Sequence, residues 1–142
     1  MLGSCQTIIV AMENKALDVV GGQQGIFSKS EHFNGKPSWK SSLNQAIWYN
    51  DLDRWTIGPI DVIGSTSGYL YAESKAEEPT DNSNEWNYWD GRNWTTSSPK
   101  DVDVRCIGKC WILISLPFYL GDALATRRLR WLAQDLCTAE LC

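Results

Sequence analysis

The first part of the chain consists of short apolar and aromatic stretches that turn-forming residues separate. Several of these stretches alternate between apolar and polar positions, which is the pattern of a β-strand with one buried face. The clearest strand candidates span residues 46–49, 54–57, 68–72, 86–89, 92–95 and 102–106, and weaker ones span 7–12, 17–20, 26–28 and 38–41. Short strands at this spacing predict a mainly β fold: a small antiparallel sheet, barrel or sandwich of hairpins.

Two hairpins are predicted most directly. The dipeptide Asp90-Gly91 lies between the arms 86–89 and 92–95, and it favours a two-residue type I′ turn. Alternation along these arms predicts one shared face for Trp86, Tyr88 and Trp94. The second hairpin joins 46–49 to 54–57 through a turn whose Asn and Asp side chains can bond to their own backbone.

The connections between strands are less uniform. Residues 60–63 follow Gly58-Pro59 and fit either a short strand or an irregular excursion. Residues 64–68 are a loop by their Gly and Ser content. The polar segment 73–85 shows no apolar periodicity and is expected to be a mobile loop.

The composition changes near residue 107. Residues 1–107 carry nine Lys and Arg against fourteen Asp and Glu, a net charge of −5, whereas residues 108–142 carry four against three, a net charge of +1. We therefore expect a Trp-rich β-module over 5–107 and a C-terminal helical extension over 108–142, with few contacts between them. The extension combines an apolar run, too short to span a bilayer as a helix, with an amphipathic helix. A membrane surface or membrane protein is a possible contact for 110–132.

The aromatic and glycine motifs of the β-module occur in a fixed order between about residues 33 and 106. They are Asn34-Gly35-Lys36-Pro37, Ile47-Trp48-Tyr49-Asn50, Arg54-Trp55-Thr56-Ile57-Gly58-Pro59, Gly68-Tyr69-Leu70-Tyr71-Ala72, Trp86-x-x-Trp89-Asp90-Gly91, Trp94 and Val102-x-Val104-x-Cys106. This half of the chain resembles a Trp/Gly-rich β-module that recurs in multidomain proteins of algae, protists and marine invertebrates. The resemblance implies a small β fold and brings no activity or ligand with it.

Several chemistries find little support in the residues. The net charge of −4 disfavours a nucleic-acid partner, because polyanion binding needs a basic surface. Acidic pairs such as Asp51 with Asp53 and Asp101 with Asp103 lack the spacing of a calcium loop. His32, the only histidine, has no sequence neighbour that would make it a base for a nucleophile. We therefore predict a protein that is not an enzyme and that uses no cofactor or metal.

The cysteine count bears on the compartment. The chain has five cysteines, Cys5, Cys106, Cys110, Cys137 and Cys142, and a secreted disulfide framework normally has an even number. Residues 1–8 also lack the basic residue that begins a secretory signal. Reduced thiols and an intracellular location are therefore expected rather than secretion.

The eight tryptophans leave two interpretations open: they fill the core, or they form an exposed binding surface. We expect Trp55, Trp86 and Tyr69 in the core. The residues Trp48, Tyr49 and Trp89 are the candidates for exposure and ligand binding. The expected function is a non-catalytic binding or interaction module with a protein partner. The alternatives are a carbohydrate-binding module that uses exposed aromatic rings, and a structural subunit that docks through its apolar C-terminal tail.

Overall fold

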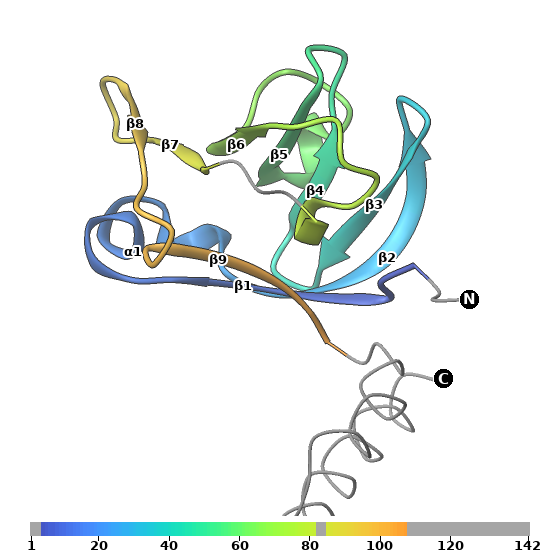
Figure 1. The fold of residues 1–142 in the computed structure, drawn as a ribbon, viewed down its shortest axis with the longest axis horizontal. Coiled ribbons are helices and arrows are strands. Elements are labelled where there is room, and N and C mark those ends of the chain that lie inside the picture. The colour runs from blue at the N-terminus through green and yellow to red at the C-terminus, as the bar shows by residue number, and fades with distance from the viewer. Residues whose placement is uncertain (1–3, 82–84, 108–142) are drawn as a thin grey trace, which may run out of the picture.

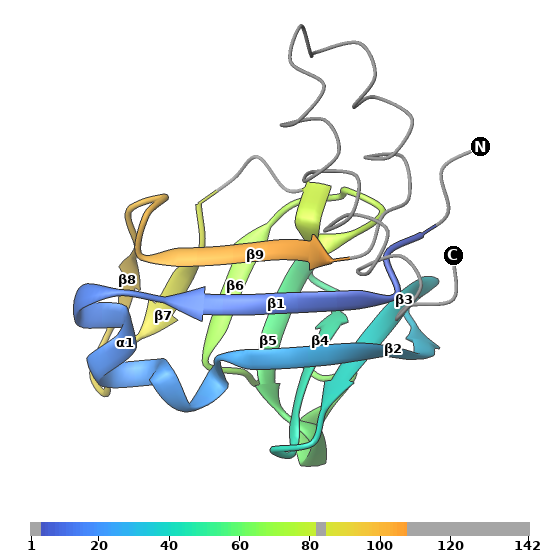
Figure 2. The same ribbon diagram turned by 90° about the horizontal axis from the view of Figure 1, so that it is seen from below.

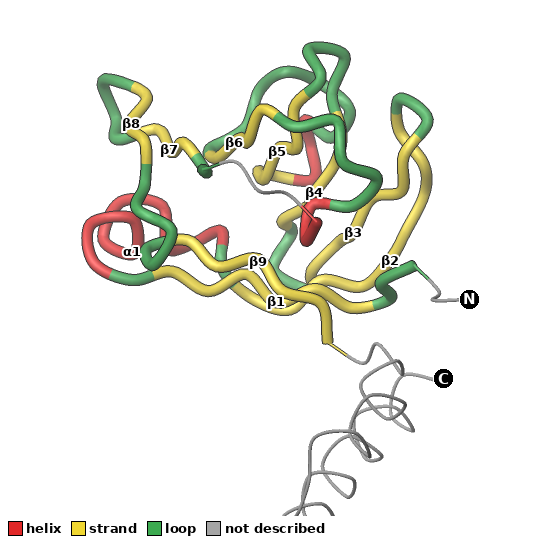
Figure 3. The backbone as a smooth tube through the Cα atoms, in the orientation of Figure 1, coloured by secondary structure: helices red, strands yellow, loops and turns green. Residues whose placement is uncertain are grey.

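The computed structural model describes residues 4–81 and 85–107 of the 142. Nine strands form one antiparallel sheet, and three 3-10 helices and one α-helix lie between them (Figures 1 and 3). The strands are β1 (Thr7–Met12), β2 (Gly25–Phe33), β3 (Lys36–Ser41), β4 (Gln45–Tyr49), β5 (Arg54–Pro59), β6 (Leu70–Glu73), β7 (Asn87–Trp89), β8 (Trp94–Thr96) and β9 (Val102–Ile107). The helices are α1 (Asn14–Val20), η1 (Gly21–Gln23), η2 (Ile60–Val62) and η3 (Pro79–Asp81). The prediction of a mainly β fold is confirmed.

The sheet is an antiparallel meander whose last strand pairs with its first. Each strand from β2 to β8 pairs with the strand before it, and β9 then pairs with the free side of β1. In Figure 1, β9, β1 and β2 lie on one side of the molecule and the strands around β5 and β6 on the other, and in Figure 2 the first three strands lie in front of the others, so the sheet curls around its core. Of the expected arrangements, a curled antiparallel sheet is the one observed.

Aromatic rings form the centre of the core. The rings of Trp39 and Trp55 lie 6.0 Å apart between centroids, and those of Tyr49 and Trp55 lie 5.3 Å apart. Trp39 and Trp55 are completely buried, and each indole N–H donates to a backbone carbonyl, of Cys5 and Ala76 respectively, at 3.0 Å. Burial of Trp55 was expected from its place in the second hairpin and is confirmed, as is burial of Trp86.

A disulfide closes the curled sheet. Cys5, just ahead of β1, is bonded to Cys106 in β9, and their Cα atoms are 5.8 Å apart. The backbone N–H of Cys5 also donates to the buried Glu78 carboxylate at 2.8 Å. The prediction of reduced thiols is therefore wrong for this pair. An odd number of cysteines gives no information about which two a long-range strand pairing will bring together.

Two local predictions need correction, and one open alternative is decided. Residues 17–20 lie in α1 and not in a strand, because Ala16 and Val20 bury one helical face at a spacing of four residues. Residues 60–63 begin with the 3-10 helix η2, so of the two alternatives for this segment the short strand is not formed. The polar segment after β6 is not simply an open loop, since Glu78 and Pro79 are buried and η3 begins at Pro79.

Both predicted hairpins are present, but one turn differs. In the hairpin of β4 and β5, Tyr49 pairs with Trp55 as expected. In the hairpin of β7 and β8, Trp89 pairs with Trp94, and the N–H of Asp90 donates to the carbonyl of Asn93 at 3.0 Å. The turn thus has four residues, 90–93, instead of two. This register places Trp94 on the face opposite the buried Tyr88, so the predicted sharing of one face is wrong for Trp94.

The expected apolar run and helix of the C-terminal extension lie outside the described residues, and its boundary at 107 stays a prediction. Among residues 4–81 and 85–107, no helix is long and apolar enough to cross a bilayer.

Candidate functional site: an aromatic cleft

Exposed aromatic residues gather on the outer face of β6, β7 and β8. Alternation along β6 turns Leu70 and Ala72 into the core, which leaves Tyr69 and Tyr71 on the outer face. Along β7 the same alternation buries Tyr88 and turns Trp89 outward. Tyr69 is 42 % exposed and Trp94 43 % exposed, so this face presents ring surface to solvent.

Strand pairing sets the positions of these rings. The N–H of Trp89 donates to the carbonyl of Tyr69 at 2.9 Å, and Trp89 and Trp94 are direct cross-strand partners. The Trp89 and Trp94 rings lie 5.5 Å apart at 63°, and the Trp94 and Tyr71 rings lie 4.7 Å apart at 72°. Edge-to-face contacts of this kind are favourable for aromatic rings, so they fix the orientation of the Trp94 indole.

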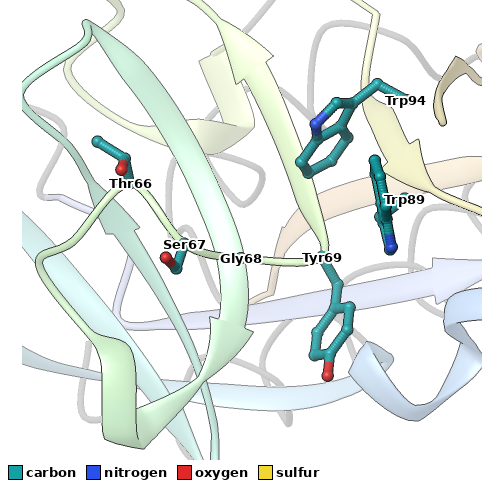
Figure 4. A pocket seen from close by; sticks show the side chains of 6 residues that line it. All are labelled: Thr66, Ser67, Gly68, Tyr69, Trp89 and Trp94. Atoms are coloured by element: carbon teal, nitrogen blue, oxygen red, sulfur yellow. The ribbon is translucent and has the colours of Figure 1, made fainter. Parts of the chain in front are cut away.

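These rings line a shallow, open cleft of about 410 Å³, which we call the aromatic cleft (Figure 4). Its lining residues are Thr66, Ser67, Gly68, Tyr69, Trp89 and Trp94. Figure 4 shows the two indoles together at one end and the hydroxyl groups of Thr66 and Ser67 at the other, with Tyr69 between them in the chain path. None of the six lining residues is charged.

The loop that carries the hydroxyl groups of Thr66 and Ser67 is fixed by a hydrogen bond from Trp48. Trp48 is completely buried on the outer side of β4, and its indole N–H donates to the carbonyl of Ser65 at 2.8 Å. Gly68 then crosses β5 so closely that a Cβ at this position would lie 2.3 Å from Cγ2 of Thr56. A glycine is therefore required where the loop enters β6, and the loop keeps its place relative to the indoles.

A charged pair supports the other side of the rings. The guanidinium of Arg54 lies 4.4 Å from the ring centroid of Tyr71, and it donates to the Glu73 carboxylate at 2.9 Å. Arg54 and Glu73 are cross-strand partners on β5 and β6. This row of contacts continues through Tyr71 to Trp94, so Arg54 helps to position the aromatic cleft without lining it.

The turn that carries the two indoles is stabilised by Asp90. The Asp90 carboxylate accepts from the backbone N–H of Asn93 at 2.7 Å and from that of Arg92 at 2.8 Å. These two backbone donors lower the pKa of Asp90, the Asn93 N–H most strongly, because they favour its charged form. Gly91 in the same turn has a φ of +98°, which glycine adopts without strain.

Of the three predicted ligand-binding residues, one lines the aromatic cleft and the other two are buried. Trp89 lines the aromatic cleft. Trp48 and Tyr49 are buried, at 0 % and 5 % exposure, so the expectation that they are exposed is wrong. Tyr49 is a core residue whose hydroxyl donates to Asp53 at 2.8 Å, and burial together with this bond raises its pKa to about 12.

Two residues of the cleft were missed as binding candidates. Tyr69 was assigned to the core, although it precedes β6 and sits on the outer face. Trp94 was predicted to share the buried face of Trp86 and Tyr88, but it is the cross-strand partner of Trp89 and lies on the outer face. Strand pairing held the missing signal: a turn of two residues would pair Trp94 with Asn87 and a turn of four pairs it with Trp89, and both partners lie on the same face.

The structure does not gather the other chemical candidates. Cys106 is in the disulfide, and His32 lies exposed on β2. Within residues 4–81 and 85–107, no group of three or more His, Cys, Asp or Glu side chains is arranged to hold a metal ion.

Comparison with models of protein families, with characterised proteins and with solved structures finds no match to this chain. The function is therefore inferred from the geometry of the aromatic cleft.

Proposed function

We propose that this chain is a non-catalytic binding module and that the aromatic cleft is its ligand site. The observation that carries the proposal is the exposure of Tyr69 and Trp94 beside Trp89 in one open cleft. The chain has ample buried positions for aromatic rings, as Trp39, Trp48 and Trp55 show. Rings left exposed on one face are typical of a recognition surface, where they offer contact area with few rotatable bonds.

The cleft is also organised before any ligand arrives. Backbone pairing sets the spacing of Trp89 and Trp94, and Tyr71 and Arg54 support Trp94 from the side. A site whose side chains are already ordered loses less conformational entropy on binding. This supports a binding role for the rings over a role in packing alone.

Two alternatives are a carbohydrate-binding module and a structural subunit that docks through its C-terminal tail. A module that uses exposed aromatic rings is compatible with both a protein and a carbohydrate ligand, and the same cleft would serve either. A structural subunit that docks through its tail depends on residues 108–142, which lie outside the described part of the chain.

The test is a comparison of the full-length chain with its Trp94→Ala variant on a glycan array and on an array of proline-rich and other linear peptides. We expect at least one class of probe to bind the wild-type chain and to lose binding in the variant. The Ile26→Ala variant is a matched control, because Ile26 is 60 % exposed on β2, far along the sheet from the cleft. Binding that Trp94→Ala leaves unchanged would contradict the proposal.

A further inference from the structure

We infer that the ligand of the aromatic cleft is a neutral oligosaccharide in solution; this inference rests on the proposed function and names its ligand class. Three properties of the cleft support it: the absence of charge in its lining, its combination of rings with hydroxyl groups, and the angle between its rings.

The absence of charged residues from the lining of the cleft favours a neutral ligand. Its six lining residues are all uncharged. Of the charged groups nearby, Arg54 bonds to Glu73, and Asp90 bonds to the N–H groups of its own turn. Arg92 is exposed in the same turn but does not line the cleft. The net charge of −4 for the chain adds no attraction for an anion. A phosphorylated, sulfated or acidic ligand would therefore find no cation among the lining residues.

The indole N–H and hydroxyl groups of the cleft have no hydrogen-bond partner in the described part of the chain, and they can bond to the hydroxyl groups of a sugar. The core indoles of Trp39, Trp48 and Trp55 all donate to backbone carbonyls, whereas the indole N–H groups of Trp89 and Trp94 have no acceptor in the described part of the chain. The hydroxyl groups of Thr66 and Ser67 likewise have no partner among residues 4–81 and 85–107. The cleft therefore offers donors beside its rings and groups that both donate and accept at its other end.

This combination matches a sugar better than a proline-rich peptide. A pyranose presents a C–H face that can lie on an aromatic ring, and hydroxyl groups at its rim that donate and accept. A run of prolines also packs on aromatic rings, but its backbone has only carbonyl acceptors, because proline lacks an N–H. The hydroxyl end of the cleft would therefore be only half used by such a peptide.

The ring geometry limits the kind of carbohydrate. The Trp89 and Trp94 planes are inclined by 63°, so they do not form one flat surface. A crystalline polysaccharide presents a flat face and would need coplanar rings to contact it over several units. Inclined rings instead suit one sugar unit stacked on a single indole while the neighbouring unit meets the edge of the other.

The experiment uses the full-length chain and three panels of soluble probes: neutral oligosaccharides built on glucose, mannose, galactose, xylose or N-acetylglucosamine; sialylated and sulfated glycans; and proline-rich peptides. Calorimetry of the best probe of each panel then compares wild type with Trp94→Ala and Ile26→Ala. We expect a neutral oligosaccharide to bind, Trp94→Ala to weaken it at least about tenfold, and Ile26→Ala to change it by less than about twofold.

A second variant separates sugar recognition from simple ring contact. The double variant Thr66→Val, Ser67→Ala removes both hydroxyl groups and leaves the rings in place, and Ser42→Ala, an exposed serine of the β3–β4 turn, is its control. The double variant should weaken the neutral oligosaccharide by about threefold or more, and the control should not.

The outcomes separate this inference from the proposed function. A peptide or a charged glycan as the Trp94-dependent ligand would overturn the inference and leave the binding cleft standing. Binding only to insoluble polysaccharide would overturn it as well. If no probe in any panel binds in a Trp94-dependent way, the inference and the proposed function both fail.

Discussion

Trp94 lies directly across the β7–β8 hairpin from Trp89, with ring centroids 5.5 Å apart and planes inclined by 63°. This pair exists because the turn between the two residues is one Asp-capped unit of four residues. The aromatic cleft therefore depends on a turn as much as on the strands that it joins.

The two classes of tryptophan should differ in their effect on stability. Trp55→Ala removes a fully buried indole and should cost about 3–5 kcal/mol of unfolding free energy. Trp94→Ala removes a ring that is 43 % exposed and two edge-to-face contacts, and should cost about 1–2 kcal/mol. Chemical denaturation of both variants measures this difference. A loss for Trp94→Ala as large as that for Trp55→Ala would mean that Trp94 is a core residue and not a binding residue.

The disulfide should contribute substantially to stability. Cys106→Ser breaks the bond to Cys5 across a sequence separation of 101 residues, and removing a native disulfide of this kind costs about 2–5 kcal/mol. Thermal unfolding with and without reductant measures the effect, and peptide mapping under non-reducing conditions identifies the linked pair. If reductant destabilises Cys106→Ser as strongly as wild type, the stabilising bond is a different one.

Gly68 should tolerate no larger residue. In Gly68→Ala the new Cβ would lie 2.3 Å from Cγ2 of Thr56 and 3.0 Å from the carbonyl oxygen of Ile57, so the loop must move. We expect a loss of about 1–3 kcal/mol, the usual cost of overpacking, together with weaker ligand binding. Gly22→Ala is the matched control, since a Cβ there meets no atom within 4 Å. Equal stability of the two variants would show that the close approach of Gly68 to β5 is incorrect.

The hairpin turn should be sensitive to acid. The folded pKa of Asp90 is lowered from its ordinary value of 3.8, so its contribution to stability is present above that value and is lost as pH falls through the lower, folded pKa. Asp90→Asn keeps an acceptor oxygen but does not titrate. We expect local opening in 87–96, measured by amide exchange corrected for its intrinsic pH dependence, to accelerate below about pH 4 in wild type and to change less in the variant. The same acceleration in both proteins would assign the acid sensitivity to another group.

Much of the fold follows from period-two patterning. The strands around Trp55 and Val104 show it clearly, and both lie where the sequence places them. What the pattern cannot supply is long-range pairing: β1 meets β9 across almost the whole described chain, and this pairing brings Cys5 and Cys106 together. The residues around Cys5 and around Cys106 show no sequence pattern that predicts this pairing.

The site was harder to predict than the fold because exposure depends on register. Facing residues of paired strands point to the same side of the sheet, so the pairing of Trp94 with Trp89 places it on the outer face, which alternation along its own arm alone does not show. Trp48 was misjudged for a different reason. It does point to the outer side of the sheet, but the 60–68 loop folds over it and buries it completely.

The most direct test of the aromatic cleft is a titration followed through the indole N–H signals of the eight tryptophans in a nitrogen-labelled sample. The titrant is the tightest-binding array probe from any panel. We predict that the signals of Trp89 and Trp94 shift on binding while those of the buried Trp39, Trp48 and Trp55 stay in place. Binding that leaves the Trp89 and Trp94 signals unmoved would contradict the assignment of the ligand site.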